Sequence, residues 1–191
     1  MGPDRPRFET SRLIVAMPEV AQATDVAEYY AANREFLAPW EPVRREEYFT
    51  EPYWRERLVT QLADYDADRA ASFVVWRRDD PDRGLLGTIN LSSIVRGPLQ
   101  AANLGYSLAQ AAQGHGFMTE SLEPIIAWAF DTLRLHRLHA GYLPRNERSA
   151  AVLRRLGFQV EGYHRDYLFI AGRWEDHIQT GLVDPGQRPP G

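Results

Sequence analysis

Residues 113–120 read Gln-Gly-His-Gly-Phe-Met-Thr-Glu, between an expected strand, Asn103–Leu108, and an expected long amphipathic helix that begins near Phe117. Glycine lets the backbone approach a ligand closely, and the first N–H groups of a helix have no partner within the helix. The helix dipole adds about half a positive charge at the same point. A strand, a glycine loop and a helix start therefore favour a bound anion such as a diphosphate.

This loop matches neither of the two common phosphate-binding motifs. A Walker loop requires Gly-x-x-x-x-Gly-Lys-Ser/Thr, and the chain contains no lysine. The dinucleotide fingerprint Gly-x-Gly-x-x-Gly fails because Thr119 stands at the place of the third glycine. On spacing alone, phosphate binding and a plain tight turn with a glycine-assisted helix start are both open.

The composition is that of one ordinary globular domain. The chain has 191 residues, of which 44% are hydrophobic and 25% charged, enough for a substantial core. We expect a single domain over residues 1–184 and a Pro/Gly-rich tail over 185–191. No apolar run is long enough to span a membrane, and Met1–Pro6 lacks the apolar core of a signal peptide, so we expect a cytoplasmic protein.

Several kinds of site are excluded or disfavoured by residue counts. The chain has no cysteine, which excludes disulfides, thiolate metal sites and a cysteine acyl-enzyme. A net charge of −4 argues against direct binding of nucleic acid. The five histidines include no His-x-x-x-His pair, so we expect no metal. The sequence does not distinguish a monomer from a homodimer.

The expected helices and strands alternate in a mixed order. We expect strands at 13–17, 72–77, 85–95, 99–108, 137–143, 158–163, 166–170 and 174–183. We expect helices at 26–36 with Thr24 as N-cap, at 51–64, at 117–133, and at 146–156 with Gly157 as the C-terminal cap. Short turns join the three strands between 72 and 108, which predicts an antiparallel meander. The expected class is α/β (α+β), with a mixed central sheet of about seven strands flanked by about four helices.

This order, with a glycine loop at the central strand-to-helix step, resembles that of the GCN5-related N-acetyltransferases (the GNAT superfamily). Their hallmark is Gln/Arg-x-x-Gly-x-Gly/Ala, and residues 113–117 match its first five places. Met118 departs from the sixth place. Because main-chain N–H groups hold the diphosphate in such a loop, Met118 can still serve. The resemblance implies the GNAT fold and acetyl-coenzyme A as the cosubstrate.

Further stretches resemble one group of this superfamily, the ribosomal-protein-alanine N-acetyltransferases of the RimJ type. They are TSRLIV at 10–15, YYAANR at 29–34, FLAPWEPVR at 36–44, NERS at 146–149, LGF at 156–158 and EGY at 161–163. The string PWEPVR is the most specific of them. The resemblance implies acetyl transfer to the N-terminal amine of a ribosomal protein, with the N-terminal alanine of small-subunit protein five as the first candidate.

The resemblance places coenzyme contacts at three points of the chain. The loop would hold the diphosphate, main-chain groups near Tyr106 would pair with the pantetheine arm as an added strand does, and Asn146 would contact the arm. As the N-cap of its helix, Asn146 also has a purely structural explanation. The expected coenzyme-binding residues are Tyr106, Ser107, Leu108, Gln113, Gly114, His115, Gly116, Phe117, Met118, Thr119 and Asn146.

The expected catalytic residues are Ser149 and Glu161. An α-amine has a pKa near 8, so a weak base or water suffices to neutralise it, and direct attack on the thioester is the simplest route. The resemblance implies that Ser149 protonates the departing thiolate or orients the thioester; the alternative is a solvated helix serine. It implies that Glu161 is the base; the alternatives are an ammonium-binding carboxylate or a surface strand residue. Other GNAT enzymes carry a glutamate on the strand before Asn146, and residues 139–142 contain none.

The first two helices cap the acceptor side in this fold, which makes Asn33, Phe36, Trp40 and Glu41 the expected substrate-binding residues. Phe36 and Trp40 are equally well explained as core residues, and Tyr142 and Tyr167 are weaker candidates. Two other functions stay open. The same fold can acetylate a small amine such as an antibiotic or a polyamine, which predicts a closed, strongly acidic pocket. The chain could also be a coenzyme-dependent factor that binds ribosomes without catalysis.

Overall fold

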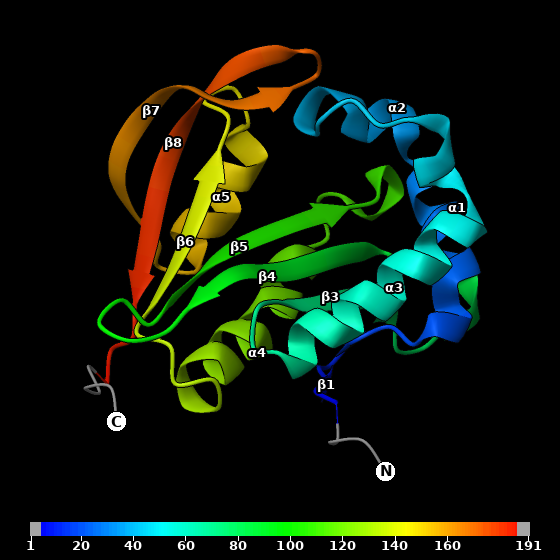
Figure 1. Cartoon of the computed structure of the whole chain (residues 1–191), viewed down its shortest axis with the longest axis horizontal. Helices are drawn as coiled ribbons and strands as arrows, with labels where there is room; N and C mark the ends of the chain where they lie inside the picture. The colour runs from blue at the N-terminus through cyan, green and yellow to red at the C-terminus, as the bar shows by residue number, and fades with distance from the viewer. Residues whose placement is uncertain (1–4, 187–191) are drawn as a thin grey trace.

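One mixed sheet forms the centre of the molecule (Figure 1). The computed structural model describes residues 5–186, so most of the expected tail lies outside the described residues. Within this part, eight strands lie in the order β1-β2-β3-β4-β5-β6-β8-β7. The strands are β1 Arg7–Glu9, β2 Leu13–Ala16, β3 Ala71–Arg77, β4 Gly87–Val95, β5 Ala101–Leu108, β6 Arg137–Tyr142, β7 Gln159–Ile170 and β8 Arg173–Val183.

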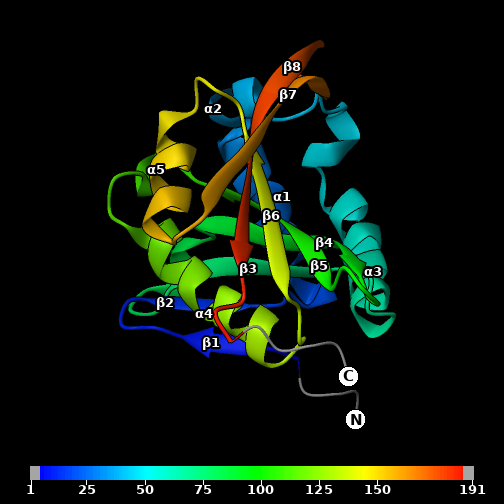
Figure 2. The same cartoon turned by 90° about the vertical axis from the view of Figure 1, so that its left-hand side faces the viewer.

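Helices cover both faces of the sheet (Figure 2). The five α-helices of residues 5–186 are α1 Ala23–Ala32, α2 Arg34–Leu37, α3 Glu51–Asp66, α4 Phe117–Asp131 and α5 Glu147–Arg155. Side chains of α4 and α5 pack with β2 to β6 in the larger core, whereas α1 and α3 pack on the opposite face in a second core. The strand β3 serves both cores, because Phe73 and Val75 face one and Val74 and Trp76 face the other.

The buried face of α4 fixes this helix on the sheet. Its side chains of Leu122, Ile125 and Ala129 are fully buried, at the helical spacing seen in the sequence. The ring of Trp128 meets the ring of Phe73 edge-on, with 5.5 Å between centroids. Truncating Leu122 to alanine would cost about 2–5 kcal/mol, as is usual for a buried leucine. The start of α4, where the glycine loop lies, is therefore held rigidly.

The expected α/β class and the antiparallel meander of β3, β4 and β5 are confirmed. The strand β1 was not expected, because its three residues are too few to show an alternating pattern. The segments expected as two strands, 158–163 and 166–170, form the single strand β7. An irregularity interrupts its pairing with β8, and there Asp166 takes a φ of 47° and donates its N–H to Asp176 Oδ1 at 2.8 Å.

The helices differ from expectation in two features: the N-cap of α1, and the division of the helix expected over 26–36 into two. The helix expected over 26–36 is divided at Asn33 into α1 and α2, which adds one to the expected four. Thr24 is not an N-cap: α1 begins at Ala23, directly after a 3₁₀ turn that has already set the helical direction. Gly157 follows α5 with a φ of 89°, as expected for a residue that ends a helix in the left-handed region.

The strands β5 and β6 part after a short stretch of parallel pairing. Only three residues of each are paired, from Ala101 with Arg137 to Asn103 with His139. On its other edge, β6 stays paired with β8 along all six of its residues. The remainder of β5, Leu104–Leu108, diverges from β6 and leaves a split in the sheet, visible in Figure 1 as the widening gap between these two ribbons. A 3₁₀ turn, Gln110–Ala112, follows β5 and leads into the glycine loop.

Candidate active site

The glycine loop presents main-chain N–H groups at the start of α4. Gly114 and Gly116 take φ values of 80° and 76°, in the left-handed region that favours glycine. Gly116 is the N-cap of α4, and no side chain of the described residues caps the helix in its place. The side chains of Phe117 and Met118 are buried in the core. The first N–H groups of α4 are thus free to bind an anion.

Two guanidinium groups flank this loop, and neither was expected from the sequence. The guanidinium of Arg12 lies 4.7 Å from the ring centre of Phe117, and its Nη2 lies 3.7 Å from the Cβ position of Gly116. Arg155 Nη1 donates to Thr119 Oγ1 at 3.2 Å. Both arginines come from segments far from the loop in sequence, so local patterns could not place them. Together they add positive charge beside the helix terminus.

Arg12 is held in place by a partly buried carboxylate in the first turn of α4. Glu120 accepts from Thr10 Oγ1 at 2.6 Å, from Arg12 N at 3.0 Å and from Arg12 Nε at 2.7 Å. Burial alone would raise the pKa of Glu120, but these hydrogen bonds outweigh it and hold the pKa below its usual value. The charge pair therefore ties α4 to the turn before β2.

Main-chain hydrogen bonds show which residues of β5 face the split. His136 N–H donates to Gln100 O at 2.7 Å on the β6 side, and Ala109 N–H donates to Leu86 O at 2.8 Å on the β4 side. Successive residues of a strand turn their main-chain groups to opposite edges. The even-numbered residues of β5 therefore point their N–H and C=O groups toward the split.

This alternation separates the three β5 residues expected to bind coenzyme. Tyr106 and Leu108 turn their main-chain groups toward the split, and Leu108 O already accepts from Gln113 Nε2 at 3.1 Å. Ser107 turns its main chain toward β4, and its hydroxyl is hydrogen-bonded to the Tyr29 hydroxyl at 2.9 Å. The geometry favours Tyr106 and Leu108 over Ser107 for main-chain contacts to a ligand.

A hydrogen bond joins β5 to the first turn of α5. The hydroxyl of Tyr106 lies 2.8 Å from Ser149 Oγ, and burial raises the pKa of Tyr106 to about 12, so the phenol stays protonated. Asn146 Oδ1 accepts from Ser149 N at 3.1 Å, which makes Asn146 the N-cap of α5. Ser149 is half-buried and hydrogen-bonded rather than a solvated helix residue. The structural explanation for Asn146 applies, and its side chain still lies beside Ser149.

Glu161 lies on β7, separated from β6 by β8. Both of its carboxylate oxygens lie 2.7 Å from Arg137 Nη1, and the carboxylate covers Gly181 so closely that a Cβ there would lie 2.5 Å from Oε1. Gly181 pairs with His139, so this carboxylate lies on the face of the sheet opposite the core that contains α5. Glu161 is not brought together with Ser149.

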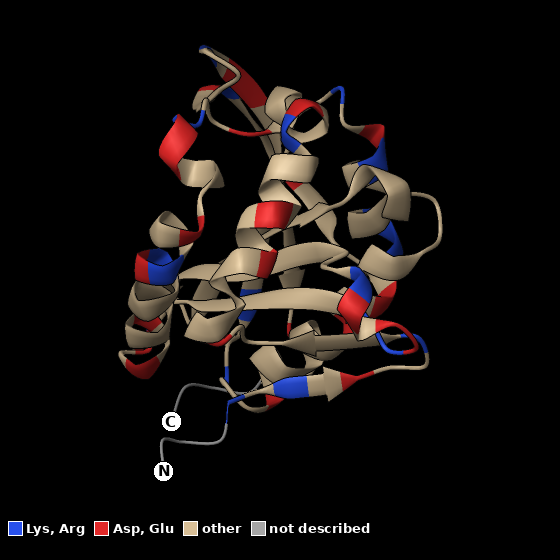
Figure 3. Ribbon diagram, turned by 90° about the vertical axis from the view of Figure 1, so that its right-hand side faces the viewer, with Lys and Arg blue, Asp and Glu red and all other residues tan. Residues whose placement is uncertain are grey.

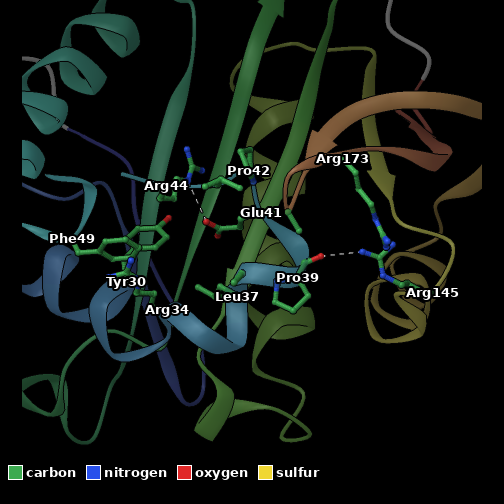
Figure 4. A pocket seen from close by; sticks show the side chains of 13 residues that line it. Tyr30, Arg34, Leu37, Pro39, Glu41, Pro42, Arg44, Phe49, Arg145 and Arg173 are labelled. Atoms are coloured by element: carbon green, nitrogen blue, oxygen red, sulfur yellow. Dashed lines mark hydrogen bonds and ion pairs between the residues drawn. The ribbon is translucent and has the colours of Figure 1, made fainter. Parts of the chain in front are cut away.

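A pocket of about 660 Å³ lies between the segment 30–49 and the turn of the β7–β8 hairpin (Figure 4). One side comes from residues 30–49, and the other from Arg145 and from Ala171 and Arg173 in the hairpin. The lining residues that the sequence did not single out include Tyr30, Arg34, Leu37, Pro39, Arg44, Phe49, Arg145 and Arg173. Five of them lie in the stretches 29–34 and 36–44 that carry the resemblance, whereas Phe49, Arg145 and Arg173 lie outside these stretches, and no local signal could have grouped those three with the others.

Three hydrogen bonds place this pocket at the mouth of the split. On the β5 side, the Tyr29 hydroxyl is bonded to Ser107, and Asn33 Oδ1 accepts from Gln110 N at 2.9 Å. On the β6 side, Arg145 Nη2 donates to Pro39 O at 3.1 Å. The segment between α1 and residue 41 therefore bridges the open end of the split.

The four expected substrate residues divide between the pocket and its support. Glu41 lines the pocket. Phe36 packs against the second core, as the structural alternative had it, and Asn33 is buried and accepts from Gln110 N, in the turn between β5 and the glycine loop. The ring of Trp40 lies under the guanidinium of Arg145, 5.6 Å from ring centre to Cζ. Three of the four thus shape the segment that carries Glu41.

The pocket is not acidic. Four arginines line it against the single carboxylate of Glu41 among the described residues. On the helical face seen in Figure 3, acidic and basic residues are interspersed rather than gathered by sign. Residues 5–186 contain no group of three potential metal ligands. Within the same residues, no helix has both the length and the apolar character that a membrane crossing requires.

Comparison with known proteins shows what this architecture is similar to. A family model described as an acetyltransferase (GNAT) domain matches residues 12–159. The [ribosomal protein uS5]-alanine N-acetyltransferase of Escherichia coli (strain K12) is 40% identical over 183 residues, which cover 96% of this chain and 93% of that protein.

Solved structures of the same family are also similar to this chain. The ribosomal-protein-S5-alanine acetyltransferase from Vibrio fischeri matches with a TM-score of 0.92 and 38% identity, over 96% of this chain and 100% of that one. Mycobacterium smegmatis RimJ in complex with CoA-disulfide matches with a TM-score of 0.84 and 25% identity, over 93% and 85% of the two chains. The chain therefore belongs to the GNAT acetyltransferases and, within them, to the RimJ type.

Proposed function

We propose that this enzyme transfers the acetyl group of acetyl-coenzyme A to the α-amine of the N-terminal alanine of ribosomal protein uS5. The observation that carries the proposal is the split between β5 and β6, with an anion-binding loop on one side and the pocket at its mouth. The acceptor is taken from the E. coli relative, which is named for its action on an alanine of uS5.

The loop fits the diphosphate of the coenzyme. Gly114 and Gly116 leave the main chain open at the start of α4, and Arg12 and Arg155 stand beside it. The pantetheine arm would run along the free edge of β5, where it can pair with main-chain groups as an added strand does. Asn146 would contact the arm near the thioester while it caps α5.

The reaction needs a neutral amine and a protonated leaving group. The amine nitrogen attacks the thioester carbonyl carbon, the C–S bond breaks, and the sulfur takes a proton. Ser149 is the group proposed to donate or relay that proton, because its hydroxyl is held at the split by the Tyr106 hydroxyl at 2.8 Å. Positioning of the two reactants supplies much of the rate in such transfers.

The lining of the pocket argues against a polyamine as acceptor. A polyamine carries several positive charges, and among the described lining residues Glu41 is the single carboxylate that could receive one of them. A peptide N-terminus carries one positive charge next to neutral main chain, which one carboxylate can match. The pocket also opens at the mouth of the split, as a polypeptide acceptor requires.

The test uses the purified enzyme, acetyl-coenzyme A and a synthetic peptide with the N-terminal sequence of uS5. Mass spectrometry should show one added acetyl group on the free-amine peptide and none on the same peptide with a formylated N-terminus. Spermidine serves as the competing small amine. Acetylation of spermidine but not of the peptide would overturn the proposed acceptor, and no turnover on any amine would support a binding factor instead.

A further inference from the structure

The proposed function requires a group that receives the acceptor's ammonium, and this inference rests on that function. We propose that Glu41 binds the protonated N-terminus of the acceptor and takes up the proton that makes the amine nucleophilic. From the sequence, Glu41 was one of four residues expected to bind the substrate. The position, burial and neighbours of its carboxylate single it out from the others.

The backbone around Glu41 is fixed at both sides of the pocket. Its carbonyl accepts from Ala171 N at 3.0 Å, which ties it to the β7–β8 turn. Two residues earlier, Pro39 O accepts from Arg145, the residue directly before the α5 N-cap. The carboxylate is thus carried on a segment anchored to the hairpin and to the end of β6 near Ser149. Figure 4 shows its side chain pointing into the pocket.

The carboxylate has one nearby cation and keeps capacity for a second. Arg44 Nε lies 3.6 Å from Glu41 Oε2, longer than a direct charge-assisted hydrogen bond. The other pocket arginines have carboxylates of their own: Arg34 pairs with Glu46, and Arg145 and Arg173 share Glu175. Burial raises the pKa of Glu41, and Arg44 only partly offsets this, which suits a group that must accept a proton near neutral pH.

The remaining groups that face Glu41 cannot take this role. Three tyrosines stay protonated because burial raises their pKa values: Tyr29 and Tyr30 on α1, and Tyr48 in the turn before α3. The Tyr30 hydroxyl lies 3.3 Å from Thr88 Oγ1, which lies 2.9 Å from Ser107 Oγ. This neutral chain of hydroxyls can orient an amine or a water, but it supplies no base.

Glu161 differs from Glu41 in how its oxygens are used. Both of them lie 2.7 Å from Arg137 Nη1. Its strand is also separated from the split by β6 and β8. Glu41 is therefore the proposed base at the pocket, and Glu161 forms an ion pair with Arg137 that stabilises the strands.

The protons balance as follows. The ammonium gives one proton to the Glu41 carboxylate, and the neutral amine attacks the thioester. When the C–S bond breaks, the second proton of the former amine nitrogen reaches the thiolate through Ser149 or water. Glu41 then releases its proton to solvent, so the net products are the acetylated amine, free coenzyme A and one proton.

The experiment measures kcat/KM for the free-amine peptide against pH in the wild type, in Glu41→Gln and in Glu35→Gln. Glu35 is an exposed glutamate of α2 outside the pocket lining, so its variant is the matched control. We expect Glu41→Gln to lose about 10²-fold in kcat/KM at neutral pH. The loss should shrink as the pH rises through the α-amine pKa near 8, since the amine then needs no base. Glu41→Asp should recover part of the activity.

A binding measurement covers the case in which Glu41→Gln is unstable. The wild type should bind the peptide more tightly than a desamino analogue that lacks the N-terminal amine, and Glu41→Asp should keep part of this preference. Equal affinity of the wild type for both peptides would overturn the inference. So would an unchanged pH profile in Glu41→Gln, or the same loss in Glu161→Gln instead. If the wild type acetylates no peptide at all, the proposed function itself has failed, which these variants do not decide.

Discussion

The glycine loop and the pocket proposed for the acceptor lie at the same split between β5 and β6, but they are assembled in different ways. The loop is a run of consecutive residues whose main chain makes the site, held at the start of α4. The pocket combines the segment 30–49, Arg145 and the hairpin turn, and side chains make the site. A main-chain site tolerates sequence change as long as the backbone conformation is kept. A side-chain site can alter its acceptor without disturbing the coenzyme.

We expect the largest loss of activity at Ser149, where the two halves of the site, the loop proposed for the coenzyme and the pocket proposed for the acceptor, meet. Ser149 lies at the split, bonded to Tyr106 from β5 and capped by Asn146. Ser149→Ala should lower kcat about 10²-fold, which is the lower end of the rate contribution of a general acid. KM for either substrate should change little. Tyr106→Phe should lower kcat less, because it removes the partner and leaves the serine hydroxyl in place. Steady-state kinetics with both substrates varied checks this, and an unchanged kcat in Ser149→Ala would leave the serine a structural role.

The second prediction tests whether the loop binds through its main chain. Gly116→Val should weaken acetyl-coenzyme A binding about 10- to 100-fold, because the shifted N-terminus of α4 loses at least one charge-assisted hydrogen bond, worth about 1.5–3 kcal/mol. Isothermal titration of the coenzyme measures this. Gly97→Val is the matched control: Gly97 lies in the β4–β5 turn with a φ of 72°, close to the 76° of Gly116.

Both valine variants force a β-branched residue into the left-handed region, so both should lose stability by about 1–2 kcal/mol. Only the loop variant should lose coenzyme affinity. If Gly97→Val weakens binding to the same extent, the loss reflects general destabilisation and the main-chain cradle is not the cause.

These two halves also differ in how well the sequence predicted them. The loop, the start of α4 at Phe117 and the helix end at Gly157 follow from local patterns, because glycine conformation and helix periodicity are properties of neighbouring residues. The guanidiniums of Arg12 and Arg155 were missed, since contacts between distant segments leave no such pattern.

On the acceptor side, the sequence named Glu41 and the supporting residues but not the arginines around them. Phe36 and Trp40 were expected in the wall, yet one packs on the core and the other lies under Arg145. An aromatic side chain suits a pocket and a core equally well, so only the fold separates these uses. Glu161 was assigned a role by resemblance, and its ion pair with Arg137 could not be seen from the sequence.

The third prediction concerns the link that closes the acceptor half. Arg145→Met removes the ion pair with Glu175 at 2.8 Å and the hydrogen bond to Pro39 O. The segment that carries Glu41 should then loosen, and KM for the acceptor peptide should rise about tenfold, equivalent to about 1.4 kcal/mol. KM for acetyl-coenzyme A should stay the same. Arg173→Met, which removes the other partner of Glu175, should have a smaller effect because that pair lies within the hairpin.

The smallest expected effect lies on the coenzyme side of the site, at the ion pair between Glu120 and Arg12. Glu120→Gln keeps the shape of the side chain and removes the charge that holds Thr10 and Arg12. We expect a loss of about 1 kcal/mol in the free energy of unfolding at pH 7, limited because the Arg12 side chain is 48% exposed. Glu123→Gln removes a charge from an exposed position of the same helix and is the control.

The pH dependence of this difference identifies its cause. The pKa of Glu120 is lower in the folded state than its usual value, so its stabilisation is present above the unfolded pKa, near 4.3, and is lost as the pH falls through the folded value. Urea unfolding of the wild type and of Glu120→Gln should therefore show a difference in the free energy of unfolding at pH 7 that shrinks at about pH 3. An equal difference at both pH values would mean that packing or neutral hydrogen bonds, rather than the charge, tie α4 to the turn before β2. The loop would then be held in the same manner as the pocket, and the contrast between the two halves would be weaker than we infer.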